Sequence, residues 1–393
     1  MKNFSNFNDF SRKEDLHFES KAIHGALGND PMTGAVSFPI YQTSTFRHKA
    51  LGESTGYDYT RLQNPTRQEL ERTMAILEEG LEGFAMSSGQ AANMSLFTLL
   101  NSGDHVLLSD DVYGGTFRIL QDIFGKYGVS FDFVDMSDIE LVKSSIKENT
   151  KMFFIETPTN PMMKVADIAK LSALAKSIGA ITVVDNTFLT PYFQKPLTLG
   201  ADAVVHSATK FIGGHNDTIA GIVVVNTPEL AAHMRLQLKS HGNGLASLDS
   251  WLLIRGLKTL ALRMEKHNEN GIKVANWLRT QKKVTKVYYV GFEDHKQYDI
   301  TLKQTTGFGG MISFNVDSFE TVQKLLANVD MIMFAESLGG TETLITYPRT
   351  QTHESIPEEV RQKLGINETF LRLSVGIEHA DDIIKDLDRA LNF

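Results

Sequence analysis

The chain has 393 residues, 42% of them hydrophobic and 22% charged, which is ordinary for a soluble globular protein and long enough for two domains. Its 39 basic and 47 acidic side chains give a formal net charge of -8 without a basic block, which disfavours nucleic acid and anionic membranes and favours small molecules as partners. Because there is no cysteine, disulfides, a thiolate metal site and a cysteine nucleophile are excluded, and covalent catalysis would need another residue.

The first 60 residues show no sustained hydrophobic periodicity, so we expect an extended arm; its turn formers are Pro31, Gly34, Pro39 and Gly56. Residues 1–20 lack the continuous apolar core of a secretory signal. The longest apolar runs, such as 222–225, have the length of strands and are too short to span a membrane. These observations predict a cytoplasmic protein.

Between the arm and residue 250, short apolar runs alternate with helical patterns. Asn64-Pro65 marks the expected start of the first helix and Gly80 its expected end. The alternation, with a helical spacing over 165–178, predicts a doubly wound α/β fold whose mostly parallel sheet binds ligands at the carboxyl ends of its strands. The predicted strands are 105–109, 131–134, 152–155, 181–184, 203–206 and 221–225.

The remainder of the chain predicts a second, smaller α/β domain. Helical patterns cover 248–265 and 381–391, and strand patterns cover 311–314 and 371–375. We therefore divide the chain into an arm (1–61), a large domain (62–250) and a C-terminal domain (251–393).

Lys210 ends the sequence Ser207-Ala208-Thr209-Lys210, which follows a predicted buried strand and precedes Gly213-Gly214. A lysine at a strand end, flanked by hydroxyls and then glycines, could form a Schiff base beside a bound phosphate, which is the layout of a pyridoxal-phosphate (PLP) site. Taken alone, the pattern fits a solvated surface lysine better, so the hypothesis depends on other motifs.

Two further motifs supply the parts that such a site needs. Ser87-Ser88-Gly89-Gln90 opens a predicted helix, whose first N–H groups could bind a phosphate, although a simple serine cap explains this motif better when it is taken alone. Asp185 ends a predicted strand and could pair with a pyridinium nitrogen, or it could cap the loop. It lies 25 positions before Lys210, about one strand–helix–strand unit, which would place both at the same sheet edge.

Two more strand ends carry polar or aromatic side chains. Asn160 lies in Glu156-Thr157-Pro158-Thr159-Asn160-Pro161, a loop made rigid by its prolines, and could bind a ring hydroxyl or a substrate carboxylate. Tyr113 follows the strand at 105–109, where its ring could stack on a cofactor or simply pack.

Together these motifs resemble the Cys/Met-metabolism family of PLP enzymes, which includes cystathionine γ-lyase, γ-synthase and β-lyase and methionine γ-lyase. The resemblance runs from about His24 to Leu391 and implies the fold-type I, aspartate-aminotransferase-like architecture. Several motifs in the same order are far more specific than any one alone. They are Tyr59-Thr60-Arg61, Asn64-Pro65-Thr66, Ser87-Ser88-Gly89, residues 111–118, 156–161, 184–187, 206–210, Gly213-Gly214-His215, 335–340 and 371–376.

The resemblance also implies roles for individual residues. Lys210 would hold the cofactor covalently, Asp185 would pair with the ring nitrogen and Tyr113 would stack on the ring. Arg372 would bind the substrate α-carboxylate through two hydrogen bonds, with Asn160 and Ser337 beside it. No metal is implied. The phosphate would be bound by Gly89, Gln90, Ser207 and Thr209, with Tyr59 and Arg61 of a neighbouring subunit.

Because members of the family are homotetramers built from dimers, the resemblance predicts active sites shared between subunits. The sequence departs from the family pattern at Gln90, where Met is commoner, at Thr60, where Ser is usual, and at Asn216-Asp217-Thr218, where Ser-Asp-Val is commoner. The role at position 90 needs only a backbone N–H, whereas the other two departures weaken the assignment to a subfamily.

Substrate choice should depend on the side-chain end of the pocket. Asp58 and Glu336 resemble acidic positions of cystathionine-handling members, whose substrate carries a second amino group, although both could be solvated loop acids. Arg118 could meet the distal carboxylate. Gly115 stands where methionine γ-lyases have Cys, which disfavours that activity.

The sequence therefore predicts γ-elimination on cystathionine, giving cysteine, 2-oxobutanoate and ammonia. In this reaction Lys210 would remove the Cα proton and Tyr113 would protonate the leaving thiolate. The alternatives are γ-replacement by a cystathionine γ-synthase, β-elimination by a cystathionine β-lyase, elimination from another γ-substituted amino acid, and a non-catalytic PLP-binding protein.

Overall fold

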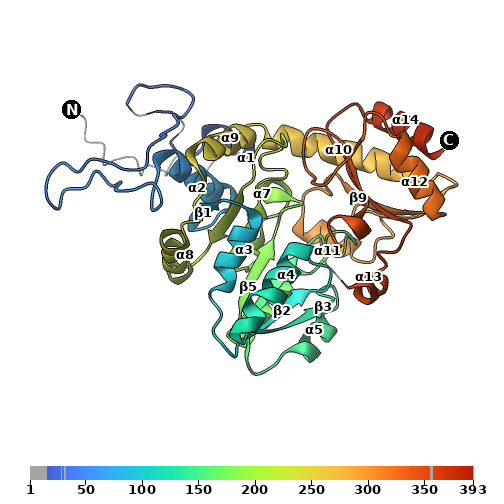
Figure 1. Cartoon of the computed structure of the whole chain (residues 1–393), viewed down its shortest axis with the longest axis horizontal. Helices are drawn as coiled ribbons and strands as arrows, with labels where there is room; N and C mark the ends of the chain where they lie inside the picture. Colours follow the sequence, from blue (N-terminus) through green and yellow to red (C-terminus); the bar gives the residue numbers. More distant parts are fainter. Residues whose placement is uncertain (1–15, 28, 31, 355–356, 393) are drawn as a thin grey trace.

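The chain folds around two β-sheets, as the computed structural model shows for residues 16–27, 29–30, 32–354 and 357–392 (Figure 1). The larger sheet has seven strands in the order β1-β7-β6-β5-β4-β2-β3, and β7 alone runs antiparallel to its neighbours. All six predicted strands form, and β1 was not predicted. The strands are β1 Glu82–Met86, β2 His105–Ser109, β3 Ser130–Val134, β4 Thr150–Glu156, β5 Ile181–Asp185, β6 Ala203–Ser207 and β7 Gly221–Val225.

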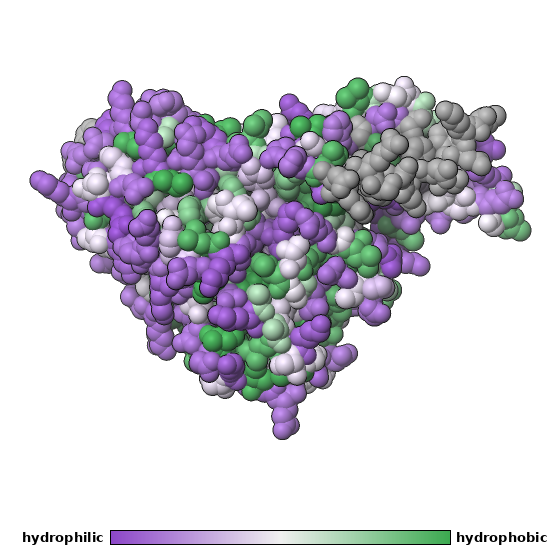
Figure 2. All heavy atoms as spheres, turned by 180° about the vertical axis from the view of Figure 1, so that it is seen from behind, coloured by the Kyte–Doolittle hydropathy of each residue, from purple (hydrophilic) through white to green (hydrophobic). Residues whose placement is uncertain are grey.

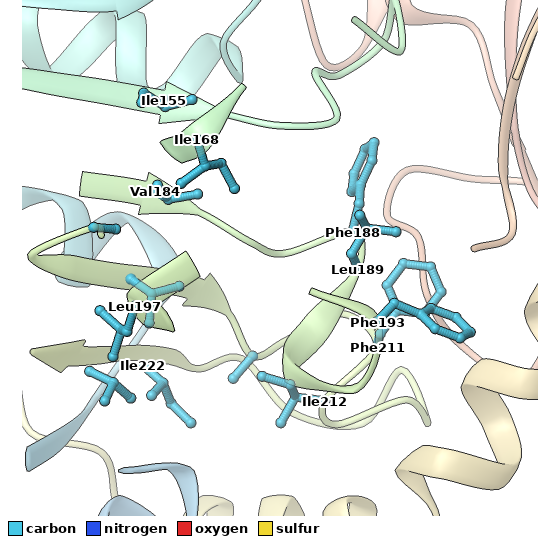
Figure 3. Close-up of a cluster of buried hydrophobic side chains, with 14 of the residues drawn as sticks. Ile155, Ile168, Val184, Phe188, Leu189, Phe193, Leu197, Phe211, Ile212 and Ile222 are labelled. Atoms are coloured by element: carbon cyan, nitrogen blue, oxygen red, sulfur yellow. The ribbon is translucent and has the colours of Figure 1, made fainter. Parts of the chain in front are cut away.

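Helices cover both faces of this sheet, because alternate side chains of each strand point to opposite faces. Val106, Phe154 and Val183 join one buried cluster, with α3 Gly89–Phe97, α4 Gly114–Asp122 and α8 Pro228–His241. Phe153 and Val184 join the other cluster, part of which Figure 3 shows, with α2 Pro65–Glu78, α6 Ile168–Ser177 and α9 Ser247–Leu257. The doubly wound fold is therefore confirmed. The smaller helices are α5 Ile139–Ser145 and α7 Thr190–Phe193, and 3₁₀ turns cover Phe124–Tyr127 and Pro196–Leu199.

The second sheet is smaller and has the order β10-β11-β12-β9-β8. Its strands are β8 Val284–Tyr288, β9 Met311–Val316, β10 Met333–Phe334, β11 Leu344–Thr346 and β12 Phe370–Ser374. The helices beside it are α10 Leu260–Leu278, α11 Tyr298–Gln304, α12 Phe319–Asn328, α13 Glu358–Leu364 and α14 Ala380–Leu391, and Pro348–Thr350 is a 3₁₀ turn. The single helix predicted over 248–265 is wrong, since α9 ends at Leu257 and α10 begins at Leu260.

The start of the chain differs in two places from the expectation. The segment predicted as extended contains a helix, α1 Phe18–His24, while its first 15 residues lie outside the described part. Helix α2 starts as predicted, because the Asn64 side chain accepts a hydrogen bond from the N–H of Thr66. It ends at Glu78 rather than at Gly80, since Glu79 adopts a left-handed conformation with φ 58°.

The rest of the arm projects from the body of the molecule (Figure 1), and large apolar side chains on it are exposed, among them Val36 at 80% and Leu51 at 104%. The face of the molecule in Figure 2 mixes hydrophilic and apolar side chains. Among the described residues, no helix combines the length and the apolar character that crossing a membrane requires.

Candidate active site

The predicted site residues gather around a cavity of about 280 Å³ at the carboxyl ends of β4, β5 and β6. Segments beside the second sheet also line this cavity, so it lies where the two sheets approach each other. A wider cleft of about 630 Å³ next to β8 holds none of the predicted residues. The predicted residues that line the smaller cavity are Gly89, Gln90, Tyr113, Asn160, Asp185, Ser207, Thr209, Lys210, Glu336, Ser337 and Arg372.

Four predicted residues lie away from this cavity. Asp58 is in the arm, where it pairs with His48 at 3.0 Å and accepts a hydrogen bond from Ser54. Arg61 lies over the ring of Tyr59, 5.7 Å from its centroid, and donates to the backbone carbonyl of Lys239. Arg118 is exposed on α4. A single chain therefore does not bring Asp58 or Arg118 to the pocket. The binding of a neighbouring subunit's cofactor phosphate by Tyr59 and Arg61 stays a prediction.

Lys210 lies just beyond β6, and its Nζ donates to the Ser337 hydroxyl at 2.9 Å. The pKa of Lys210 is lowered from 10.5 to about 8, chiefly by burial and also by the positive charge of Arg372, while the negative charge of Glu336 opposes both effects. Ser337 has φ 104°, a strained conformation that is typical of functional sites. A lysine in this environment reaches the neutral, nucleophilic form near neutral pH.

Uptake of PLP by the cofactor-free protein should therefore depend on pH with a midpoint near the pKa of Lys210. Because only the neutral amine attacks an aldehyde, the uptake rate should rise about tenfold from pH 6 to 7 and level off above about pH 8. The measurement is the growth of visible absorbance after mixing at each pH. Glu336→Gln should move the plateau to lower pH, whereas a plateau that begins only near pH 10 would show an ordinary lysine.

Asp185 ends β5, and Thr187 donates to its Oδ1 twice, from the backbone N–H at 3.0 Å and from the hydroxyl at 2.5 Å. Burial raises the pKa of Asp185, while the hydrogen bonds from Thr187 and the charge of His206 act against that rise. Its Oδ2 has no hydrogen-bond partner in the described part of the chain. A buried carboxylate with a free oxygen at a cavity suits a protonated ring nitrogen.

Glu156 begins the motif 156–161, and the sequence predicts no role for it. One of its oxygens accepts from the backbone N–H of Tyr113 and the other from that of Asn160, both at 3.0 Å. It is in register with Asp185 on the neighbouring strand, and burial and the charge of Asp185 raise its pKa. Glu156 thus fixes the backbone of the two loops that carry Tyr113 and Asn160. The feature of the sequence that could have identified Glu156 as a site residue is its position at the end of β4.

Arg372 is 1% exposed and lies on β12. It donates to Asn160 Oδ1 at 2.9 Å, to the Ser337 carbonyl at 2.8 Å and to Thr346 Oγ1 at 3.2 Å. Burial lowers its pKa to about 10, so it stays charged at neutral pH. Its Nε has no partner among the described residues, which leaves a charged donor for a carboxylate.

The N-terminus of α3 is suited to bind an anion. Ser88 caps the helix by accepting from the N–H of Ala91 at 3.0 Å, and the first turn leaves backbone N–H groups for a ligand. A Cβ at Gly89 would lie 2.9 Å from the Cβ of Ser207, so only glycine allows this close approach. Ser207 and Thr209 line the cavity beside this turn.

Tyr113 also lines the cavity, and its side chain constrains position 115. A Cβ there would lie 2.6 Å from the Tyr113 ring and 2.8 Å from Gln90 Cδ. A larger residue at position 115 would therefore displace the ring.

These groups fit PLP, because an amine, a free carboxylate oxygen and a helix N-terminus surround one cavity that also holds an unpartnered guanidinium nitrogen. The fold and this set of groups define a PLP-dependent enzyme.

The chain belongs to the Cys/Met metabolism family of PLP-dependent enzymes, whose family model matches residues 19–392. It is 49% identical over 373 residues to a cystathionine beta-lyase of Lactococcus lactis subsp. cremoris (strain MG1363), covering 95% of this chain and 98% of the relative. It is 46% identical over 375 residues to a cystathionine gamma-synthase/O-acetylhomoserine (thiol)-lyase of Bacillus subtilis (strain 168), covering 95% and 96%. A crystal structure of cystathionine gamma-lyase from Lactobacillus plantarum complexed with L-serine matches with a TM-score of 0.94 and 43% identity, covering 96% of this chain and 99% of that chain.

Proposed function

We propose that the protein catalyses γ-elimination on cystathionine, giving cysteine, 2-oxobutanoate and ammonia. The observation that supports this best is Glu336, which lines the cavity and is close enough for its charge to act on both Lys210 and Arg372. A carboxylate at this point suits a substrate that carries a second, distal ammonium group.

PLP would supply the electron sink that stabilises negative charge at the substrate Cα. In the proposed arrangement Arg372 and Asn160 bind the α-carboxylate and so fix the direction of the Cα–H bond. Lys210 Nζ, beside Ser337, takes up the Cα proton, for which its lowered pKa suits it. A second proton must then leave Cβ before the Cγ–S bond can break, and the Tyr113 hydroxyl donates a proton to the departing sulfur.

We also propose that Gly89, Gln90, Ser207 and Thr209 bind the cofactor phosphate, that Asp185 pairs with the ring nitrogen and that Tyr113 stacks on the ring. A homotetramer built from dimers would add Tyr59 and Arg61 of a neighbouring subunit. The exposed apolar side chains of the arm support such an assembly. The expected location is the cytoplasm.

The second candidate is β-elimination, which would give homocysteine and pyruvate, and it is favoured by the 49% identity to a cystathionine beta-lyase. Similarity to a cystathionine gamma-synthase supports γ-replacement as a third. The test is to incubate the purified, PLP-loaded protein with cystathionine and identify the oxoacid. We expect 2-oxobutanoate; pyruvate would establish β-elimination instead. No oxoacid, but cystathionine formed from an O-acylhomoserine and cysteine, would establish a synthase.

Glu336→Gln should lower kcat/KM for cystathionine by about 10- to 100-fold, because a hydrogen bond to a charged group contributes about 1.5–3 kcal/mol. The loss should be much smaller with O-acetylhomoserine, which has no distal ammonium group. Steady-state oxoacid release with both substrates measures the difference. Equal losses on the two substrates would contradict the role of Glu336 in binding the distal ammonium.

A further inference from the structure

A buried ionisable pair lies behind the cofactor cavity and is not used by the proposed mechanism. Glu78 is the last residue of α2, His206 lies on β6, and Glu78 Oε1 is 2.6 Å from His206 Nε2. Both side chains are 0% exposed. Two ionisable groups removed from water cost free energy even when they are paired, so a requirement other than stability can explain why they lie here.

The pair holds the turn that carries Asp185. Asn186, the next residue, donates to the same Glu78 oxygen at 3.3 Å. The Asn186 side chain also exchanges hydrogen bonds with Gln194, donating to its carbonyl at 2.8 Å and accepting from its Nε2 at 3.0 Å. The turn is therefore tied to β6 through Glu78 and His206, and to α7 through Gln194.

A second link ties the same turn to β6 on the cavity side. The backbone N–H of Ser207 donates to Thr187 Oγ1 at 2.9 Å, and Thr187 Oγ1 donates to Asp185 Oδ1 at 2.5 Å. The backbone N–H of Asn186 also donates to the Val205 carbonyl at 3.0 Å, so β6 holds the turn through these two side-chain links and through its backbone. One link contains a pair of ionisable groups and the other contains hydroxyl and amide groups only.

His206 also acts on Asp185 electrostatically, since its charge lowers the pKa of Asp185 against the effect of burial. Glu78 Oε2 and His206 Nδ1 have no hydrogen-bond partners in the described ranges, so the side chain of His206 makes its one hydrogen bond there to Glu78. The other titratable groups at Asp185 are Glu156 on the neighbouring strand and Lys210 across the cavity.

We propose that Glu78 and His206 form a positioning pair for Asp185: they fix the turn 185–187 behind the carboxylate that faces the cofactor ring nitrogen. This rests on the proposed placement of Asp185 opposite that nitrogen. Neither residue touches substrate or cofactor, so the pair acts through Asp185 alone.

The test uses His206→Gln, which removes the imidazole from its contact with Glu78 and keeps a polar group, on the PLP-loaded protein. Loosening the turn 185–187 weakens the contact of the Asp185 carboxylate with the ring-nitrogen proton. We expect the pH at which the visible band of the bound cofactor changes to rise by at least about half a unit. We also expect PLP to bind about tenfold more weakly and kcat to fall about tenfold, with KM for cystathionine changed less than about twofold.

A matched control is His105→Gln. His105 is also 0% exposed and makes hydrogen bonds to Thr150 and Asp132. It is the first residue of β2, however, and so lies at the amino ends of the strands, away from the cavity. This variant should lower the melting temperature and leave the spectrum, PLP affinity and kcat unchanged. The proposal is wrong if His206→Gln, like His105→Gln, lowers only the melting temperature. It is also wrong if His206→Gln lowers kcat without moving the spectral transition.

Two further variants keep the test decisive if His206→Gln does not fold. Glu78→Gln weakens the same link between Asn186 and His206, so the spectral transition should again move to higher pH, and an unchanged transition would overturn the proposal. Glu78→Gln in an Asp185→Asn background should add no further spectral change, whereas an additive change would show that the pair does not act through Asp185. These spectra require no substrate turnover, so they remain interpretable if the cystathionine assignment fails.

Discussion

Lys210→Ala is expected to abolish the visible absorbance of the bound cofactor and to lower elimination activity by at least about 10³-fold. The substitution removes two functions at once, because the same amine attaches PLP and takes up the Cα proton. Its buried Nζ makes one hydrogen bond, to Ser337, and the residue left in place is small, so the fold should survive. The measurements are the spectrum of the protein incubated with PLP and the rate of oxoacid release.

Lys126→Ala provides the control, because Lys126 is exposed in the 3₁₀ turn after α4, does not line the cavity and should leave both readouts unchanged. Wild-type absorbance and turnover in Lys210→Ala would place the cofactor on another residue and contradict the proposed site.

Arg372→Ala should lower kcat/KM by about 30- to 5,000-fold, mostly through KM, because removing one partner of a buried, hydrogen-bonded charge contact costs about 2–5 kcal/mol. Arg372→Lys should recover only part of this loss, since an ammonium group cannot donate in parallel to both oxygens of a carboxylate. Steady-state kinetics with cystathionine measure both variants.

A stability measurement must accompany these kinetics, because Arg372 also holds Asn160 Oδ1 and the Ser337 carbonyl. Arg279→Lys, at an exposed ion pair just after α10, should change neither KM nor kcat. An unchanged KM in folded Arg372→Ala would show that another group binds the α-carboxylate.

The sequence predicts the large sheet well because its strands are short apolar runs bounded by polar or turn-forming residues. Strand β1 escapes prediction, since Glu82-Gly83 interrupts the apolar pattern and Gly83 serves a close approach: a Cβ there would lie 2.2 Å from the Glu71 carbonyl. The break between α9 and α10 escapes as well, because the apolar spacing continues across Lys258 and Thr259.

The sequence predicts those site residues that lie at strand ends or within local motifs. Lys210, Asp185 and Asn160 meet in space because parallel strands end at one sheet edge. The Glu78–His206 contact could not be read from the sequence, since its partners are 128 positions apart and neither belongs to a local pattern that requires the other. Asp58 and Arg118 show the opposite case, in which resemblance suggests a role that one chain's geometry does not supply.

The attachment point of PLP tests the central claim most directly. The PLP-loaded protein is reduced with borohydride, digested and analysed by mass spectrometry for a lysine that carries the phosphopyridoxyl group. We predict one modified lysine, Lys210, with stoichiometric labelling in wild type and none in Lys210→Ala. Labelling of a different lysine, or no labelling of the protein that has been given PLP, would contradict the site and the mechanism built on it.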